Sequence, residues 1–143
     1  MTIPNAKPFF SADDITKILK EVKVSLETGM LVSGKKVIEF EQNFSNYIGT
    51  KHAIAVNSGT AALKIALQFF NIENYQVIVP TNSFVASANS VKLSGGIPIL
   101  ADINPDTLCI DFDDIKNKLT SKTKGIMVVH LAGLPCPDIN QIK

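Results

Sequence analysis

The sequence predicts an α/β fold, a three-layer sandwich in which helices flank a mostly parallel sheet. Two observations support this prediction. From residue 53 onward, short apolar runs alternate with segments of helical periodicity, a pattern typical of βαβ units with right-handed crossovers. The chain has 143 residues, of which 45% are hydrophobic and 19% charged, as expected for an ordinary globular domain.

The first fifty residues are predicted to form an arm and two peripheral helices. Residues 4–10 contain two prolines and two phenylalanines without periodicity, so they should form an extended arm. Ser11 is followed three residues later by an acidic side chain, a capping-box pattern that predicts a first helix ending near Gly29. A second amphipathic helix is expected over 37–47, stopped by Gly49.

The remaining chain is predicted to alternate between strands and helices. The apolar run over residues 53–56 predicts a first strand that is buried on both faces. The elements expected after it are a helix over about 60–70, a strand over 77–79, a helix over about 84–93, a strand over 97–101, a helix over 111–119 with Asp111 as its N-cap, a strand over 125–129 and a helix that begins at Asp138.

Composition argues against several classes of partner. Lys and Arg number 14 against 13 Asp and Glu, so no bulk positive field attracts nucleic acid or an anionic membrane. Neither a secretory leader nor an apolar run of about 20 residues is visible, so we expect neither targeting nor membrane insertion. Cys109 and Cys136 form no CxxC pair, which favours two buried or idle thiols in a reducing, cytoplasmic setting.

The segment Asn57-Ser58-Gly59-Thr60 is the first candidate for ligand binding. It lies between an apolar run and an Ala-rich helix, whose first-turn N–H groups should point above the carboxyl end of the strand. Gly59 permits close backbone approach, and the hydroxyls of Ser58 and Thr60 can bond to a phosphate oxygen. The alternative is that Ser58 or Thr60 only caps the helix.

Two further residues are expected at the same edge of the sheet. Phe84 ends the turn after the next strand, where an aromatic ring can stack on a flat heterocycle, although a core position is the alternative. His130 ends a later strand and could approach a cofactor or substrate, or could be a hydrogen-bonded structural histidine. His52 and His130 do not form a metal site, because no carboxylate or cysteine joins them at ligand spacing.

Five stretches spread over nearly the whole chain resemble a known family. The chain is similar to the N-terminal part of the DegT/DnrJ/EryC1/StrS aminotransferases, sugar-nucleotide aminotransferases of fold type I that depend on pyridoxal 5'-phosphate (PLP). The resemblance implies an N-terminal arm with helices over 1–50 and the first, incomplete part of the PLP-binding large domain over 51–143. The stretches that carry it are GKKVIEFE at 34–41, AIAVNSGTAAL at 53–63, VIVP at 77–80, FVA at 84–86 and VHLAG at 129–133.

The resemblance also implies a function. Gly59 and Thr60 would bind the cofactor phosphate, and Phe84 would stack on its ring. Ser58 and His130 are added from the residues themselves, as a further phosphate ligand and as a candidate for substrate binding. The family converts keto-sugar nucleotides to amino-sugar nucleotides, usually with glutamate, in polysaccharide biosynthesis, and works as a cytoplasmic homodimer. No catalytic residue is assigned, because the family's Schiff-base lysine and the acid that pairs with the pyridinium nitrogen would lie beyond Lys143, and we expect this chain alone to be inactive.

Departures from the family pattern and alternative functions accompany this hypothesis. Lys64 and Ala132 replace a common His and a common Tyr, and the surface position expected for Lys64 makes it a poor substitute for the missing lysine.

Some relatives carry His instead of the Schiff-base lysine and act as sugar dehydratases. A non-catalytic module that binds ligands or partner chains is another alternative, whereas a dinucleotide-binding Rossmann domain is weaker, since residues 58–60 provide one glycine where three are expected.

Overall fold

The computed structural model describes residues 7–143, and the chain folds as two compact units, Met1–Ala55 and Val56–Lys143. Residues 4–6 of the predicted arm lie outside the described residues. The rest of the arm, residues 7–10, has no regular secondary structure, and the side chains of Phe9 and Phe10 are exposed.

The first predicted helix is confirmed as α1 (Ala12–Thr28). The Ser11 hydroxyl accepts the backbone N–H of Asp14 at 3.1 Å and donates to the Asp14 carboxylate at 2.7 Å. The first bond satisfies one of the N–H groups that a helix start leaves without an intrahelical acceptor, and the second holds the serine hydroxyl in place for it. Gly29 ends the helix with φ of 68°, a left-handed conformation that costs glycine little.

The second predicted helix is confirmed as α2 (Lys35–Ile48). Gly49 terminates it with φ of 78°, and its N–H donates to the carbonyl of Ser45. An exposed ion pair links the two helices of the N-terminal unit, with Lys36 Nζ 3.4 Å from Glu21. Most apolar side chains of α1 and α2 are exposed, so these helices bury little surface within the described part of their unit.

The C-terminal unit contains a three-stranded parallel sheet in which β1 (Gln76–Pro80) lies between β2 (Ile97–Ala101) and β3 (Thr123–Ile126). The central strand pairs through Ile78 with Ile99 on one side and Ile126 on the other. A register shift between Gln76 and Val77 disturbs its pairing with β3. The elements in chain order are α3 (Gly59–Phe69), β1 (Gln76–Pro80), α4 (Ala86–Leu93), β2 (Ile97–Ala101), α5 (Phe112–Lys118), β3 (Thr123–Ile126), the 3-10 turn η1 (Leu131–Gly133) and α6 (Ile139–Ile142).

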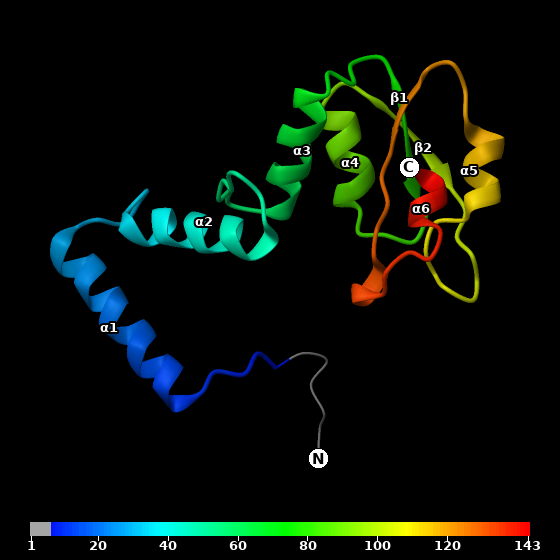
Figure 1. Cartoon of the computed structure of the whole chain (residues 1–143). Helices are drawn as coiled ribbons and strands as arrows, with labels where there is room; N and C mark the ends of the chain where they lie inside the picture. The colour runs from blue at the N-terminus through cyan, green and yellow to red at the C-terminus, as the bar shows by residue number, and fades with distance from the viewer. Residues whose placement is uncertain (1–6) are drawn as a thin grey trace. The chain divides into compact units, whose positions relative to one another are not determined.

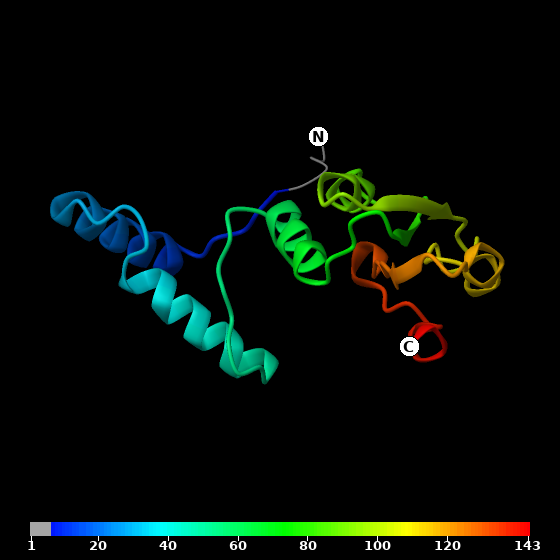
Figure 2. The ribbon, with the colours of Figure 1, turned by 90° about the horizontal axis from the view of Figure 1, so that it is seen from above.

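Helices cover both faces of this sheet, which confirms the predicted three-layer arrangement within the unit (Figure 1). Val77 and Val79 of β1 join a core with Val91 of α4, while Ile78 points to the opposite core, which contains Ile115 of α5. Successive strand side chains alternate between faces, so one short apolar strand supplies both cores. The helices α3 and α4 lie side by side in both views (Figures 1 and 2).

Two predicted strands differ from the structure. The prediction of a strand over 53–56 is wrong. This segment has no regular secondary structure, and within residues 7–143 no strand pairs with it. Ile54, predicted to be buried, is 82% exposed. β3 begins at Thr123 rather than at Gly125 and ends at Ile126 rather than at Val129, although the Met127 N–H still donates to the carbonyl of Ile78. An apolar run identifies a candidate strand, but the segment forms a strand only where a neighbouring strand is available to accept and donate its backbone hydrogen bonds.

The helix boundaries agree better with the sequence. Asp111 caps α5 as predicted, and its carboxylate accepts the Asp114 N–H at 2.8 Å. The helix expected from Phe84 begins two residues later at Ala86, after a turn in which the Ser87 N–H donates to the Phe84 carbonyl. Along residues 7–143, no helix combines the length and apolarity that a membrane span requires.

Candidate functional site

The predicted phosphate turn, residues 57–60, opens helix α3. Ser58 is the N-cap: its hydroxyl accepts the Ala61 N–H at 3.2 Å, and its carbonyl accepts the Ala62 N–H at 3.1 Å. The N–H groups of Gly59 and Thr60, by contrast, donate to no acceptor within the described residues. A helix N-terminus with free donors is a place where an anion binds favourably.

The turn also has room for a ligand. A Cβ added to Gly59 would meet no atom within 4 Å, and the residue does not have the positive φ that would demand glycine for backbone reasons. The capping interpretation of Ser58 is confirmed, but it does not compete with phosphate binding. A hydroxyl that accepts the Ala61 N–H still has its own proton to donate to a phosphate oxygen.

Phe84 follows the carboxyl end of β1, and its side chain is 78% exposed. The alternative of a core phenylalanine is therefore wrong for this structure. The backbone before it is held at two points: the Thr81 N–H donates to the carbonyl of Ala101 at 2.9 Å, and the Ser83 hydroxyl donates to the carbonyl of Pro80 at 3.3 Å. An exposed ring on a fixed turn is suited to stacking against a flat ligand.

His130 lies in the irregular chain after β3, and its side chain is exposed but hydrogen-bonded. Its Nδ1 accepts the backbone N–H of Cys136 at 3.0 Å. The accepting nitrogen carries no proton, so the neutral ring has its proton on Nε2, which remains available as a donor. Ala132 and Gly133 have φ of 51° and 85°, which turns the chain back toward the histidine. A structural role for His130 is thus present, and its approach to a substrate stays a prediction.

The topology brings these loops to one edge of the sheet. β1 and β3 are neighbours, yet α4 packs on one face of the sheet and α6 on the other. This is a topological switch point, and in open α/β sheets ligands bind beyond the carboxyl ends of such strands. Phe84 follows β1, and His130 comes four residues after β3 ends.

The phosphate turn belongs to the same edge. The last residue of α3 leads through residues 70–75 to the amino end of β1, and α3 packs beside α4, which runs back from the carboxyl end. The start of α3 therefore lies toward the carboxyl edge, where Phe84 and His130 are also found. Within residues 7–143 no hydrogen bond joins the three loops to one another, so their proximity depends on the fold.

Lys64 and both cysteines are partly or fully buried in the C-terminal unit. Lys64 is half-buried on α3, and its backbone carbonyl accepts the Ser94 hydroxyl at 3.3 Å. Both cysteines are buried and free, as expected from the sequence, and burial is the main cause that raises the pKa of the Cys136 thiol. The structure of residues 7–143 contains no group of three His, Cys, Asp or Glu side chains placed to hold a metal ion.

Sequence reasoning assigned no role to Glu41, which the structure connects to the chain before the phosphate turn. Its Oε1 accepts the backbone N–H of Ala55 at 2.8 Å. The two residues are 14 positions apart, so no short motif indicates the bond. The inclusion of Glu41 in the family-like stretch 34–41 was the only signal.

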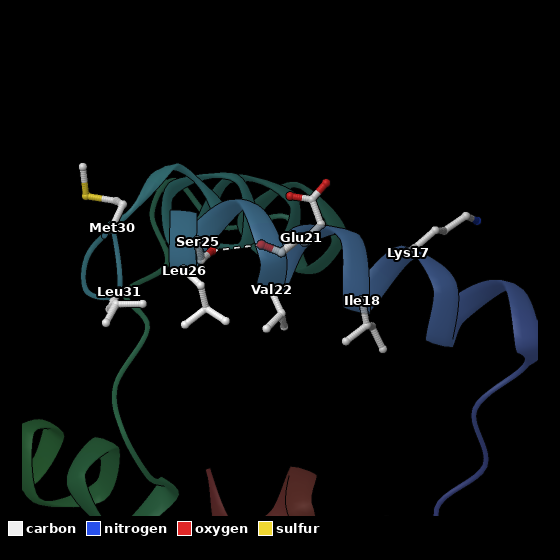
Figure 3. A pocket seen from close by; sticks show the side chains of 8 residues that line it. All are labelled: Lys17, Ile18, Glu21, Val22, Ser25, Leu26, Met30 and Leu31. Atoms are coloured by element: carbon white, nitrogen blue, oxygen red, sulfur yellow. Dashed lines mark hydrogen bonds between the residues drawn. The ribbon is translucent and has the colours of Figure 1, made fainter. Parts of the chain in front are cut away.

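An open groove lies on α1 in the N-terminal unit (Figure 3). Ile18, Val22 and Leu26 extend from the same side of the helix because they are four residues apart. Lys17 and Glu21 point away from that side, so no polar groups converge there to orient a ligand. The groove is an apolar helix face and lacks the features expected of a cofactor site. Its complete lining is Lys17, Ile18, Glu21, Val22, Ser25, Leu26, Met30 and Leu31.

Comparisons with known sequences point to one family. A family model described as the DegT/DnrJ/EryC1/StrS aminotransferase family matches residues 12–143. The 3-oxo-glucose-6-phosphate:glutamate aminotransferase of Bacillus subtilis is 43% identical over 122 residues, which cover 85% of this chain and 28% of that protein. The GDP-perosamine synthase of Caulobacter vibrioides is 45% identical over 104 residues, or 72% of this chain and 28% of that protein.

Solved structures agree with the sequence comparisons. The putative sugar aminotransferase Spr1654 from Streptococcus pneumoniae, solved in PLP and PMP forms, matches with a TM-score of 0.87 and 32% identity, over 99% of this chain and 36% of that chain. A Bacillus subtilis protein with bound cofactor PMP matches with a TM-score of 0.86 and 40% identity, over 93% and 31%. The chain thus spans about a third of the length of these relatives.

Proposed function

The chain belongs to the DegT/DnrJ/EryC1/StrS aminotransferase family, and on this premise we propose that it forms the N-terminal part of a PLP-dependent sugar aminotransferase. One observation carries the proposal. The N–H groups of Gly59 and Thr60 have no acceptor within residues 7–143, and α3 begins toward the same carboxyl edge of the sheet at which the exposed Phe84 follows β1. A phosphate and a flat ring, joined in one molecule, match these two features.

The residues present fit the cofactor. Gly59 and Thr60 would donate backbone N–H groups to its phosphate, and the hydroxyls of Ser58 and Thr60 would add further donors. Phe84 would lie against the face of the pyridine ring. When bound, PLP supplies an electron-accepting ring that stabilises negative charge next to the transferred nitrogen. The Nε2–H of His130 would donate to an oxygen of the sugar substrate.

The substrate is proposed to be a keto-sugar nucleotide that becomes an amino-sugar nucleotide, with glutamate as the amino donor. The names of two relatives support parts of this choice. That of the Bacillus subtilis enzyme includes glutamate, together with a sugar phosphate, and that of the Caulobacter vibrioides enzyme includes a GDP-linked sugar. A homodimer and a cytoplasmic location are part of the same proposal. Because the chain matches only about a third of its relatives, we expect these 143 residues alone not to catalyse transamination. Measurable amino transfer from glutamate by the purified chain would contradict that expectation.

The cofactor site can be tested by binding of pyridoxamine 5'-phosphate, which lacks the aldehyde that would react with surface lysines. Equilibrium dialysis should show that it binds at least about tenfold more tightly than pyridoxamine without phosphate, as expected when an anion meets free helix N–H donors. Phe84→Ala should weaken binding of the phosphorylated compound. Phe69→Ala is the matched control, since Phe69 is 84% exposed at the other end of α3. Equal binding of the two compounds, or equal effects of the two substitutions, would refute the proposed site.

A further inference from the structure

We infer that Glu41 is a positioning residue for the phosphate turn, because its carboxylate anchors the extended segment that leads into that turn. The inference rests on the proposed function, since it concerns the same cofactor-binding residues. The observation behind it is the hydrogen bond in which the backbone N–H of Ala55 donates to Glu41 Oε1 at 2.8 Å. Ala55 is three residues before Ser58, the N-cap of α3.

Glu41 lies on the one face of α2 that is not fully exposed. Glu41 is half-buried and Ser45, one helical turn later, is buried, whereas every other residue of α2 is exposed. The chain reverses at Gly49, where the N–H groups of Gly49 and Thr50 both donate to the Ser45 carbonyl, at 2.9 and 3.0 Å. Residues 53–55 then return to the Glu41 face within the same N-terminal unit.

The carboxylate replaces a strand partner. In the described part of the chain no strand pairs with residues 53–56, and the N–H of Ala55 finds its acceptor in a side chain. A hydrogen bond to an ionised carboxylate is about twice as strong as one between neutral groups. A single side chain can therefore hold this otherwise unpaired stretch at one point.

The hydrogen bond between Ala55 and Glu41 lies close enough to the phosphate turn to affect ligand binding. Three residues span at most about 10 Å, so motion at Ala55 passes through a very short tether into the turn. A binding turn that is ordered before the ligand arrives loses less conformational entropy on binding, which favours affinity. The Ser58 cap bonds to Ala61 and Ala62 do not involve Glu41, so α3 itself should survive the loss of the anchor.

The test compares Glu41→Met with Glu41→Gln in the full chain. Methionine keeps the length and helix propensity of the side chain but removes the acceptor oxygen, whereas glutamine keeps an acceptor. Glu39→Met is the control, because Glu39 lies on the same helix and bonds to Lys36 instead. The readouts are amide hydrogen exchange over residues 55–62 without ligand, the affinity for pyridoxamine 5'-phosphate, and circular dichroism to verify the helices.

Glu41→Met should accelerate exchange at Ala55 and also at Ala61 and Ala62, whose N–H groups bond to Ser58 in the turn. It should weaken binding of pyridoxamine 5'-phosphate roughly three- to tenfold, the effect of losing part of one charge-assisted hydrogen bond. Glu41→Gln should restore most of both readouts, and Glu39→Met should change neither. Acceleration confined to Ala55, or Glu41→Gln as damaging as Glu41→Met, would overturn the inference. Failure of the wild-type chain to bind the compound would count against the proposed function, while the spread of exchange would still decide the role of Glu41.

Discussion

Gly96 offers a sharp test of packing in the C-terminal unit. A Cβ added there would lie 2.5 Å from Ile72 Cδ1 and 3.0 Å from Val91 Cγ1, and both of these side chains are buried in the core between α4 and the sheet. Distances this short require the neighbours to move, and overpacking of a filled core typically costs about 1–3 kcal/mol. Gly96→Ala is therefore expected to lower the free energy of unfolding by about 2 kcal/mol.

Thermal and urea denaturation followed by circular dichroism measure this loss. A domain of 60–100 residues shifts its Tm by roughly 4–8 °C per kcal/mol, so the unit Val56–Lys143 should melt about 8–16 °C lower. Gly59→Ala is the matched control, since its added Cβ meets no atom within 4 Å and should leave Tm unchanged or slightly raised. A Gly96→Ala protein that melts within about 2 °C of the wild type would refute the packing argument.

Three further predictions concern charge, thiols and the cap. Hydrogen bonding to Lys118 lowers the pKa of the Asp114 carboxyl. The contribution of Asp114 to stability is therefore present above its ordinary pKa and is lost as pH falls through the lowered value. In urea denaturation at several acidic pH values, Asp114→Asn should reduce the fall in the free energy of unfolding as pH decreases. Native Cys109 and Cys136 should react with a thiol reagent much more slowly than in urea, because both are buried. Ser58→Ala should cost about 1 kcal/mol in urea denaturation by removing a helix cap.

Local sequence signals were enough to predict most elements of the fold. Ser11 and Asp111 carry side chains that accept N–H groups three residues later, so both helix starts could be placed to the residue. The apolar run at 77–79 identified the central strand, because a strand buried on both faces needs apolar side chains at every position. These signals depend only on neighbours in the chain.

Features that depend on distant partners could not be predicted in this way. The run at 53–56 reads like the run at 77–79, yet among residues 7–143 the second is flanked by strands on both sides and the first pairs with none. The register shift between Gln76 and Val77 is equally invisible in the sequence. Phenylalanine is a residue type usually found in cores, but Phe84 is exposed because it lies in the turn between β1 and α4, beyond the packed faces of the sheet.

The candidate site joins these two kinds of information. Each loop alone is ambiguous, since Ser58 also caps α3, His130 also holds the N–H of Cys136, and Phe84 alone could be a chance exposed ring. What reduces the ambiguity is the crossover pattern, which places α4 and α6 on opposite faces and so gathers the three loops at one carboxyl edge. Each residue can then serve the fold and a ligand together, because the hydroxyl of Ser58 and the Nε2–H of His130 both keep a free proton after their structural bonds are made.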